Sequence, residues 1–118
     1  MLNDAWPAEW MRGVLGLCVL KSLEPGPTYG YAIASALEAA GLGTVKGGTL
    51  YPLLTRLETA GFVTTEWKAG ERGPGRKYFR ITPAGTEELA RLQQSWRHFS
   101  RTISDHLDNS SAAPEETP

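Results

Sequence analysis

The stretch Gly47-Gly48-Thr49-Leu50-Tyr51-Pro52-Leu53-Leu54-Thr55-Arg56-Leu57-Glu58-Thr59-Ala60-Gly61 decides the fold class of this chain. Its leucines are spaced three and four residues apart and therefore share one face of a helix: Leu50, Leu53, Leu54 and Leu57. The opposite face carries short or planar hydrogen-bonding groups: Thr49, Tyr51, Thr55 and Arg56. Gly61 follows where a left-handed residue commonly ends a helix. We expect a short helix with one core face and one polar face.

The start of this helix depends on Pro52. If Thr49 is the N-cap, Pro52 lies in the first turn, where its missing N–H costs nothing. If the helix begins near Lys46 instead, Pro52 lies further inside and should kink it. The first arrangement is favoured here.

The next segment has the pattern of a β-hairpin. Phe62 to Trp67 are strand-forming residues, a Gly- and Pro-rich loop follows, and apolar and polar residues alternate again from Arg76 to Thr82. Between Trp67 and Arg80 there are five basic residues and one acid, a net charge of +4, although the whole chain has a net charge of −1. A basic hairpin after a candidate recognition helix can contact a phosphate backbone. The alternative is an ordinary solvated surface hairpin.

Helices are expected both before and after the segment 47–82, which contains the short helix and the hairpin. Trp10 to Leu23 is a largely apolar first helix, and Thr28 is a plausible N-cap for a second helix that ends near Ala40. Thr82 followed by Pro83 predicts the start of a last helix of about 25 residues. Apolar or amphipathic residues recur along it at spacings of three and four: Leu89, Leu92, Trp96, Phe99, Ile103 and His106. Such a seam favours packing on the first helix and on the same helix of a second copy.

Length and composition bound the function. The 118 residues suggest one domain, with no apolar run of about 18 residues for a membrane span and no basic start of a signal peptide. Cys18, the only cysteine, is expected to be a small buried hydrophobe, and His98 and His106 lack partners at metal-ligand spacing. We expect a cytoplasmic protein without cofactor or metal. The chain offers no nucleophile with a base, so an enzyme is not expected.

Several motifs in a fixed order resemble the PadR family of bacterial transcriptional regulators. They are the first helix, Tyr29-Gly30-Tyr31, Gly48-Thr49-Leu50-Tyr51-Pro52, Arg56-Leu57-Glu58, Gly73-Pro74-Gly75-Arg76-Lys77-Tyr78 and Thr82-Pro83-Ala84-Gly85. The resemblance covers Trp10 to about Leu107. It implies a homodimeric winged-helix repressor that binds a palindromic double-stranded DNA operator and releases it when an effector arrives. The single helix after the wing resembles the shorter subfamily, in which some members bind flat aromatic compounds between tryptophans at the dimer interface.

The resemblance also implies roles for individual residues. Thr49 and Tyr51 would face the major groove, and Tyr29, Tyr31 and Lys46 would lie near the DNA backbone. Phosphate or minor-groove contacts in the wing would come from Arg72, Arg76 and Lys77. The dimer would form through Leu89, Leu92, Trp96, Phe99 and Ile103, and a planar aromatic effector would contact Trp96, Trp10 and Phe99. The alternative for Trp96 is a purely structural role, since a tryptophan in such a seam is usually dimer core.

The predicted fold class is mostly α with a two-stranded β wing, a winged helix-turn-helix with a long C-terminal helix. Its predicted parts are an N-terminal arm (1–9), a DNA-binding domain (10–82), a dimerisation helix (83–108) and a disordered tail (109–118). The predicted function is that of a ligand-responsive repressor. Two alternatives remain open: a dimeric winged-helix module for protein–protein contact, and a ligand-binding protein that binds no operator.

Overall fold

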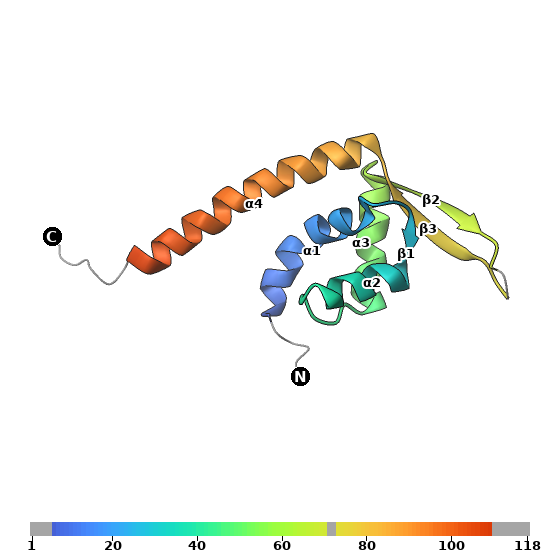
Figure 1. Ribbon diagram of the computed structural model, residues 1–118, viewed down its shortest axis with the longest axis horizontal. Coiled ribbons are helices and arrows are strands. Elements are labelled where there is room, and N and C mark those ends of the chain that lie inside the picture. Colours follow the sequence, from blue (N-terminus) through green and yellow to red (C-terminus); the bar gives the residue numbers. More distant parts are fainter. Residues whose placement is uncertain (1–5, 71–72, 110–118) are drawn as a thin grey trace.

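The computed structural model describes residues 6–70 and 73–109, which form helices around one core, a small sheet and a long helix that leaves the body (Figure 1). In chain order the elements are α1 (Ala8–Leu23), β1 (Thr28–Tyr29), α2 (Gly30–Ala39), α3 (Gly47–Thr59), β2 (Val63–Lys68), β3 (Arg76–Ile81) and α4 (Pro83–Asn109). The expectations for Arg72, for residues 1–5 of the arm and for residues 110–118 of the tail lie outside the described residues.

The sheet has the order β1-β3-β2 and is antiparallel. β2 and β3 form the predicted hairpin, with Val63 opposite Ile81 and Lys68 opposite Arg76. The sheet has one strand more than the predicted wing, because Thr28 and Tyr29 pair with the free edge of β3. The prediction of Thr28 as N-cap was therefore wrong: its backbone belongs to the sheet, and the extended Tyr29 precedes α2.

The leucine face of α3 lies in the core, as its spacing predicted. Leu50, Leu53 and Leu54 are buried, and Leu57 is half-buried. The buried residues around them come from every other helix and from the hairpin: Leu15, Val19, Leu20, Leu23, Ile33, Leu37, Val63, Phe79 and Leu89. One continuous core therefore fixes how α3 is rotated about its own axis.

The end of α3 follows the prediction and its start does not. Gly61 has a φ of +87°, and the N–H of Phe62 donates to the carbonyl of Leu57 at 2.9 Å, which closes the helix. At the other end the N–H of Leu50 donates to the carbonyl of Lys46 at 2.9 Å. Lys46 is the N-cap, so the placement of the cap at Thr49 was wrong. Pro52 consequently lies inside the helix, where it has no N–H to donate to the carbonyl of Gly48.

Thr82 joins the start of α4 to the end of α3. Its hydroxyl accepts the N–H of Gly85 at 2.9 Å, as an N-cap does, and donates to the carbonyl of Gly61 at 2.7 Å. Gly85 is buried so close to the backbone of Phe62 that a Cβ there would overlap with the Phe62 carbonyl oxygen. The predicted cap is confirmed, and these contacts fix the direction in which α4 leaves the domain.

We expect Thr82→Ala to lower the free energy of unfolding by about 1–2 kcal/mol, because the cap and the bond to Gly61 are lost together. Thr82→Ser keeps a hydroxyl at the same position and should lose much less. Urea denaturation followed by circular dichroism measures both variants. Equal stability of the alanine and serine variants would contradict a stabilising role for this hydroxyl.

Candidate nucleic-acid interface

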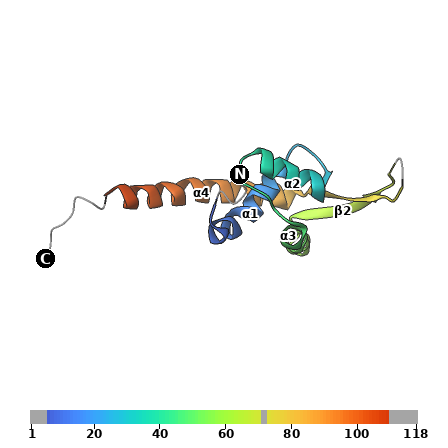
Figure 2. The ribbon, with the colours of Figure 1, turned by 90° about the horizontal axis from the view of Figure 1, so that it is seen from below.

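The outward face of α3 is exposed next to the hairpin. Tyr51, Thr55 and Arg56 are exposed on α3, and Figure 2 shows this helix at one edge of the molecule with β2 beside it. The hydroxyl of Thr55 donates to the carbonyl of Tyr51 at 3.0 Å, so its hydrogen is already used within the helix. The other exposed polar groups on this face of α3 are the hydroxyl of Thr49, the phenol of Tyr51 and the guanidinium of Arg56.

Tyr51 is held against the first residue of α2. A Cβ at Gly30 would overlap with the Tyr51 hydroxyl, so only glycine at position 30 allows this ring position. The ring also lies 6.5 Å from the ring of Phe79, centroid to centroid, and Tyr51 is 48% exposed. Tyr51, which the sequence predicts to face the major groove, therefore has one side of its ring packed against the protein and the other side exposed to solvent.

Two aromatic rings support the basic side chains of the wing. Tyr29 of β1 and Tyr78 of β3 meet edge to face with centroids 5.5 Å apart. The guanidinium of Arg76 lies 4.3 Å from the centre of the Tyr29 ring, and the amine of Lys68 lies 4.8 Å from the centre of the Tyr78 ring. Stacking on a ring orients a cation while leaving its charge available to a second partner. Tyr29 is half-buried in this cluster, where it positions Arg76.

The other face of the hairpin carries Lys77 and Trp67, which oppose each other in the sheet. The amine of Lys77 lies 5.7 Å from the centre of the Phe79 ring, and Trp67 is 71% exposed. Trp67 was not among the predicted contacts. An aromatic residue at the outer end of a strand, beside a basic loop, was the signal that could have identified it.

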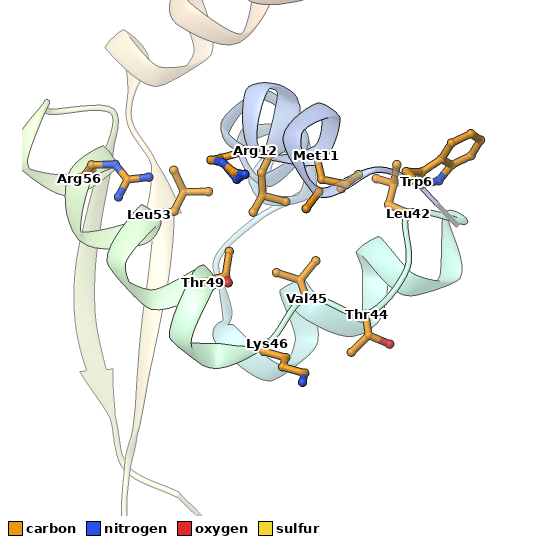
Figure 3. A pocket seen from close by; sticks show the side chains of 12 residues that line it. Trp6, Met11, Arg12, Leu42, Thr44, Val45, Lys46, Thr49, Leu53 and Arg56 are labelled. Carbon is orange, nitrogen blue, oxygen red and sulfur yellow. The ribbon is translucent and has the colours of Figure 1, made fainter. Parts of the chain in front are cut away.

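The predicted DNA-contacting residues fall into two groups in space. Tyr29, Tyr51 and Arg76 lie where α2, α3 and the sheet meet, and Tyr31 is exposed on the first turn of α2. Lys46 and Thr49, with Arg56, instead line a pocket between α1 and α3 (Figure 3). Thr49 therefore lies nearer α1 than its neighbour Tyr51 does.

The seam of α4 is buried only at its beginning. Leu89 is buried and Leu92 is half-buried, but Trp96 and Ile103 remain 43% and 40% exposed and Phe99 is more exposed still. The rings of Trp96 and Phe99 lie 6.4 Å apart. An exposed apolar row of this kind marks a surface of interaction.

Cys18 is half-buried beside the core, whereas the sequence predicted a fully buried side chain. Burial raises the pKa of the Cys18 thiol above its usual value, so the thiol stays protonated and behaves as a small apolar group. No three His, Cys, Asp or Glu side chains of residues 6–70 and 73–109 gather as a metal site would require. Within those same ranges no helix is long and apolar enough to cross a membrane.

A family model described as the transcriptional regulator PadR-like family matches residues 19–91, more than half of the chain. The chain belongs to the PadR-like family of transcriptional regulators. The transcriptional regulator Rv3488 of Mycobacterium tuberculosis is 30% identical over 95 residues, which cover 80% of this chain and 87% of that protein. An uncharacterized 37.1 kDa protein in transposon TN4556 of Streptomyces fradiae is 35% identical over 100 residues, 85% of this chain but only 26% of that protein.

Solved structures agree with this assignment. A PadR family transcriptional regulator from Eggerthella lenta superposes with a TM-score of 0.79 at 34% identity, covering 87% of this chain and 89% of its own. A PadR-like regulator from Bacillus cereus gives a TM-score of 0.76, also at 34% identity, covering 86% of this chain and 99% of its own. The expected family, the winged-helix fold class and a regulatory rather than enzymatic role are confirmed.

Proposed function

We propose that this PadR-family regulator is a homodimeric repressor that binds a palindromic operator with α3 and the wing and is released by a small molecule. The observation that carries the proposal is the exposed polar face of α3 beside a hairpin whose described cations outnumber its acids. Tyr51 on α3 offers a hydroxyl and a ring edge to the base edges of the major groove, and Thr49 in the first turn of α3 offers a hydroxyl. Arg76, oriented by Tyr29, offers a guanidinium to phosphates.

We expect the wing to supply affinity for any duplex and α3 to supply sequence preference. Replacing both Arg76 and Lys77 by Ala should weaken binding to selected and random duplexes alike, and lower the salt slope by up to about one per lost contact. Tyr51→Ala should instead reduce the preference for the selected duplex. The measurement is fluorescence anisotropy over a salt series, with duplexes first selected from random DNA by the purified protein.

The matched control for the wing variant is Lys21→Ala combined with Arg101→Ala, which removes the same charge from α1 and α4. Equal losses of duplex affinity in both double variants would mean that only the net charge of the protein matters and that the wing does not contact DNA. Absence of any salt-dependent duplex binding by the wild type would favour a module for protein–protein contact.

The dimer is proposed from the exposed half of the α4 seam. Trp96, Phe99 and Ile103 are exposed from the middle of α4 onward. Figure 1 shows that this end of α4 extends away from the other elements. A second copy related by a two-fold axis would present the same residues to them. Trp10, exposed on α1, would contribute to the same interface.

Ile103→Glu should therefore give poorly folded monomers, because an acid in the seam opposes burial of the row against the second copy. Sedimentation velocity at micromolar concentration measures the mass. Gln94→Glu introduces the same acid on the opposite side of α4 and should remain dimeric. A wild-type protein that sediments as a compact monomer would overturn the proposed dimer.

The effector is proposed to bind between the two copies of Trp96. If the two-fold axis crosses near the middle of α4, the two indoles face each other and can hold a planar aromatic molecule between them, with Phe99 beside it. Such stacking contributes about 0.5–1.5 kcal/mol per ring pair beyond the buried area. A bound ligand would alter the spacing of the two α3 helices, which must match half-sites about 34–36 Å apart. A differential affinity of about 2.7 kcal/mol between the two geometries would lower operator affinity about a hundredfold.

We expect planar cationic dyes to quench the tryptophan fluorescence of the wild type and to release its DNA, and Trp96→Ala to lose both responses. Trp67→Ala serves as the control, because it removes another exposed indole, which lies on the hairpin and not on α4. Equal quenching and equal DNA release in wild type and Trp96→Ala would show that Trp96 is dimer core only.

A further inference from the structure

A pocket of about 400 Å³ lies between the first turns of α1, the connection 40–46 and the first turns of α3 (Figure 3). It is separate from the α4 seam: Trp96, Phe99 and Trp10 do not line it. Its volume is at the small end of the range for ligand sites.

One wall of the pocket is fixed by hydrogen bonds. The indole N–H of Trp6 donates to the carbonyl of Gly41 at 3.0 Å, which ties the residues before α1 to the end of α2. Gly41 has a φ of +92°, and the N–H of Leu42 donates back to the carbonyl of Leu37 at 3.0 Å, so this connection is closed tightly. Leu42 is thereby held facing Met11 of α1 across the pocket (Figure 3).

The inner surface of the pocket is aliphatic and its rim is cationic. Met11, Leu15, Leu42, Val45 and Leu53 form the apolar lining. Arg12, Lys46 and Arg56 line it as well, and the described lining residues include neither Asp nor Glu. The lining contains one aromatic ring, Trp6, at the edge, and so gives a planar ligand no pair of faces between which to stack.

Two of the three cations extend over the same part of the pocket. Figure 3 shows Arg12 of α1 and Arg56 of α3 on either side of Leu53, whereas the amine of Lys46 points away at the opposite rim. Among residues 6–70 and 73–109 the ion pairs involve neither arginine. Two arginines above an aliphatic surface are suited to a molecule with an alkyl body and one anionic end.

We propose that this pocket binds a medium-chain aliphatic carboxylate. The carboxylate accepts hydrogen bonds from Arg12 and Arg56, and the alkyl chain covers Leu53, Val45 and Leu42. Binding places a negative charge beside α3 and engages Arg56, so it opposes the approach of DNA phosphates to this helix. This last step rests on the proposed function, whereas binding of the carboxylate does not.

The probes are octanoate, octan-1-ol and octylammonium, which share the alkyl chain and differ in charge. We expect isothermal titration calorimetry to rank octanoate first and octylammonium last. We also expect octanoate to shift the backbone amide signals of Arg12, Val45 and Thr49 in ¹H–¹⁵N spectra. Arg12→Gln should weaken octanoate binding about tenfold, since one charge-assisted contact is lost. Lys21→Gln, at the other end of α1, should leave it unchanged.

DNA binding is measured separately, without and with octanoate. We expect octanoate to weaken duplex binding by the wild type and to have a much smaller effect on Arg12→Gln.

Equal binding of octanoate and octylammonium would overturn the carboxylate site, and so would an unchanged affinity of Arg12→Gln for octanoate. Signal shifts at Trp96 and Phe99 in place of Val45 and Thr49 would overturn it too, because octanoate would then occupy the α4 seam. Octanoate bound at Val45 with unchanged duplex affinity would refute only the opposition between ligand and DNA. A protein that binds octanoate but no duplex would refute the proposed function and leave the site intact.

Discussion

The burial of one face of α3 is the constraint on which the rest of the structure depends. Leu50 and Leu54 are almost completely inaccessible, and burial of each stabilises the fold by about 1.5–3 kcal/mol. A rotation of α3 by one residue would remove both from the core, so the geometry of the helix also fixes which side chains face outward. Tyr51 is exposed because Leu50 and Leu54 are not, and Gly30 then determines how far its ring can lean toward α2. The packing of the core thus determines which side chains the proposed DNA-contacting face of α3 exposes.

The second constraint is the tight junction of α3, the hairpin and α4. Gly61 ends α3, Phe62 lies against Gly85, and the hydroxyl of Thr82 donates to the carbonyl of Gly61, so a few short contacts join three elements. A change in the direction of α4 must be absorbed at this junction or passed on to α3 and the wing. Because the exposed half of the seam is on α4, these contacts are a physical route by which a partner on that seam would act on the proposed recognition helix.

The sequence predicted those features whose chemistry is local. The leucine spacing, the glycine after α3 and the Thr-Pro pair before α4 each specify a structure within a few residues, and the structure has all three. The two incorrect caps have non-local causes. Thr28 pairs with Phe79, which lies far along the chain, and no local pattern reveals that pairing. For α3, both starting points were compatible with Pro52, and the choice depends on the extended backbone of Lys46 at the end of a connection packed near α1.

The difference between local and non-local causes also decides which parts of the candidate site could be predicted from the sequence. The positive charge of the wing could be predicted from composition, but the stack of Arg76 on Tyr29 and the pocket under Arg12 require tertiary contacts.

α1 is the element that connects the pocket with α4. One side of it, with Met11, Arg12 and Leu15, lines the pocket against α3, while the same helix packs on α4 and exposes Trp10. A ligand between α1 and α3 therefore contacts both the proposed recognition helix and the helix against which α4 rests. Such a ligand can shift the regulator between two arrangements only by as much as its affinities for them differ. The two arginines that line the pocket come from two different helices, so a carboxylate that bonds to both would bind most tightly at one separation of α1 and α3.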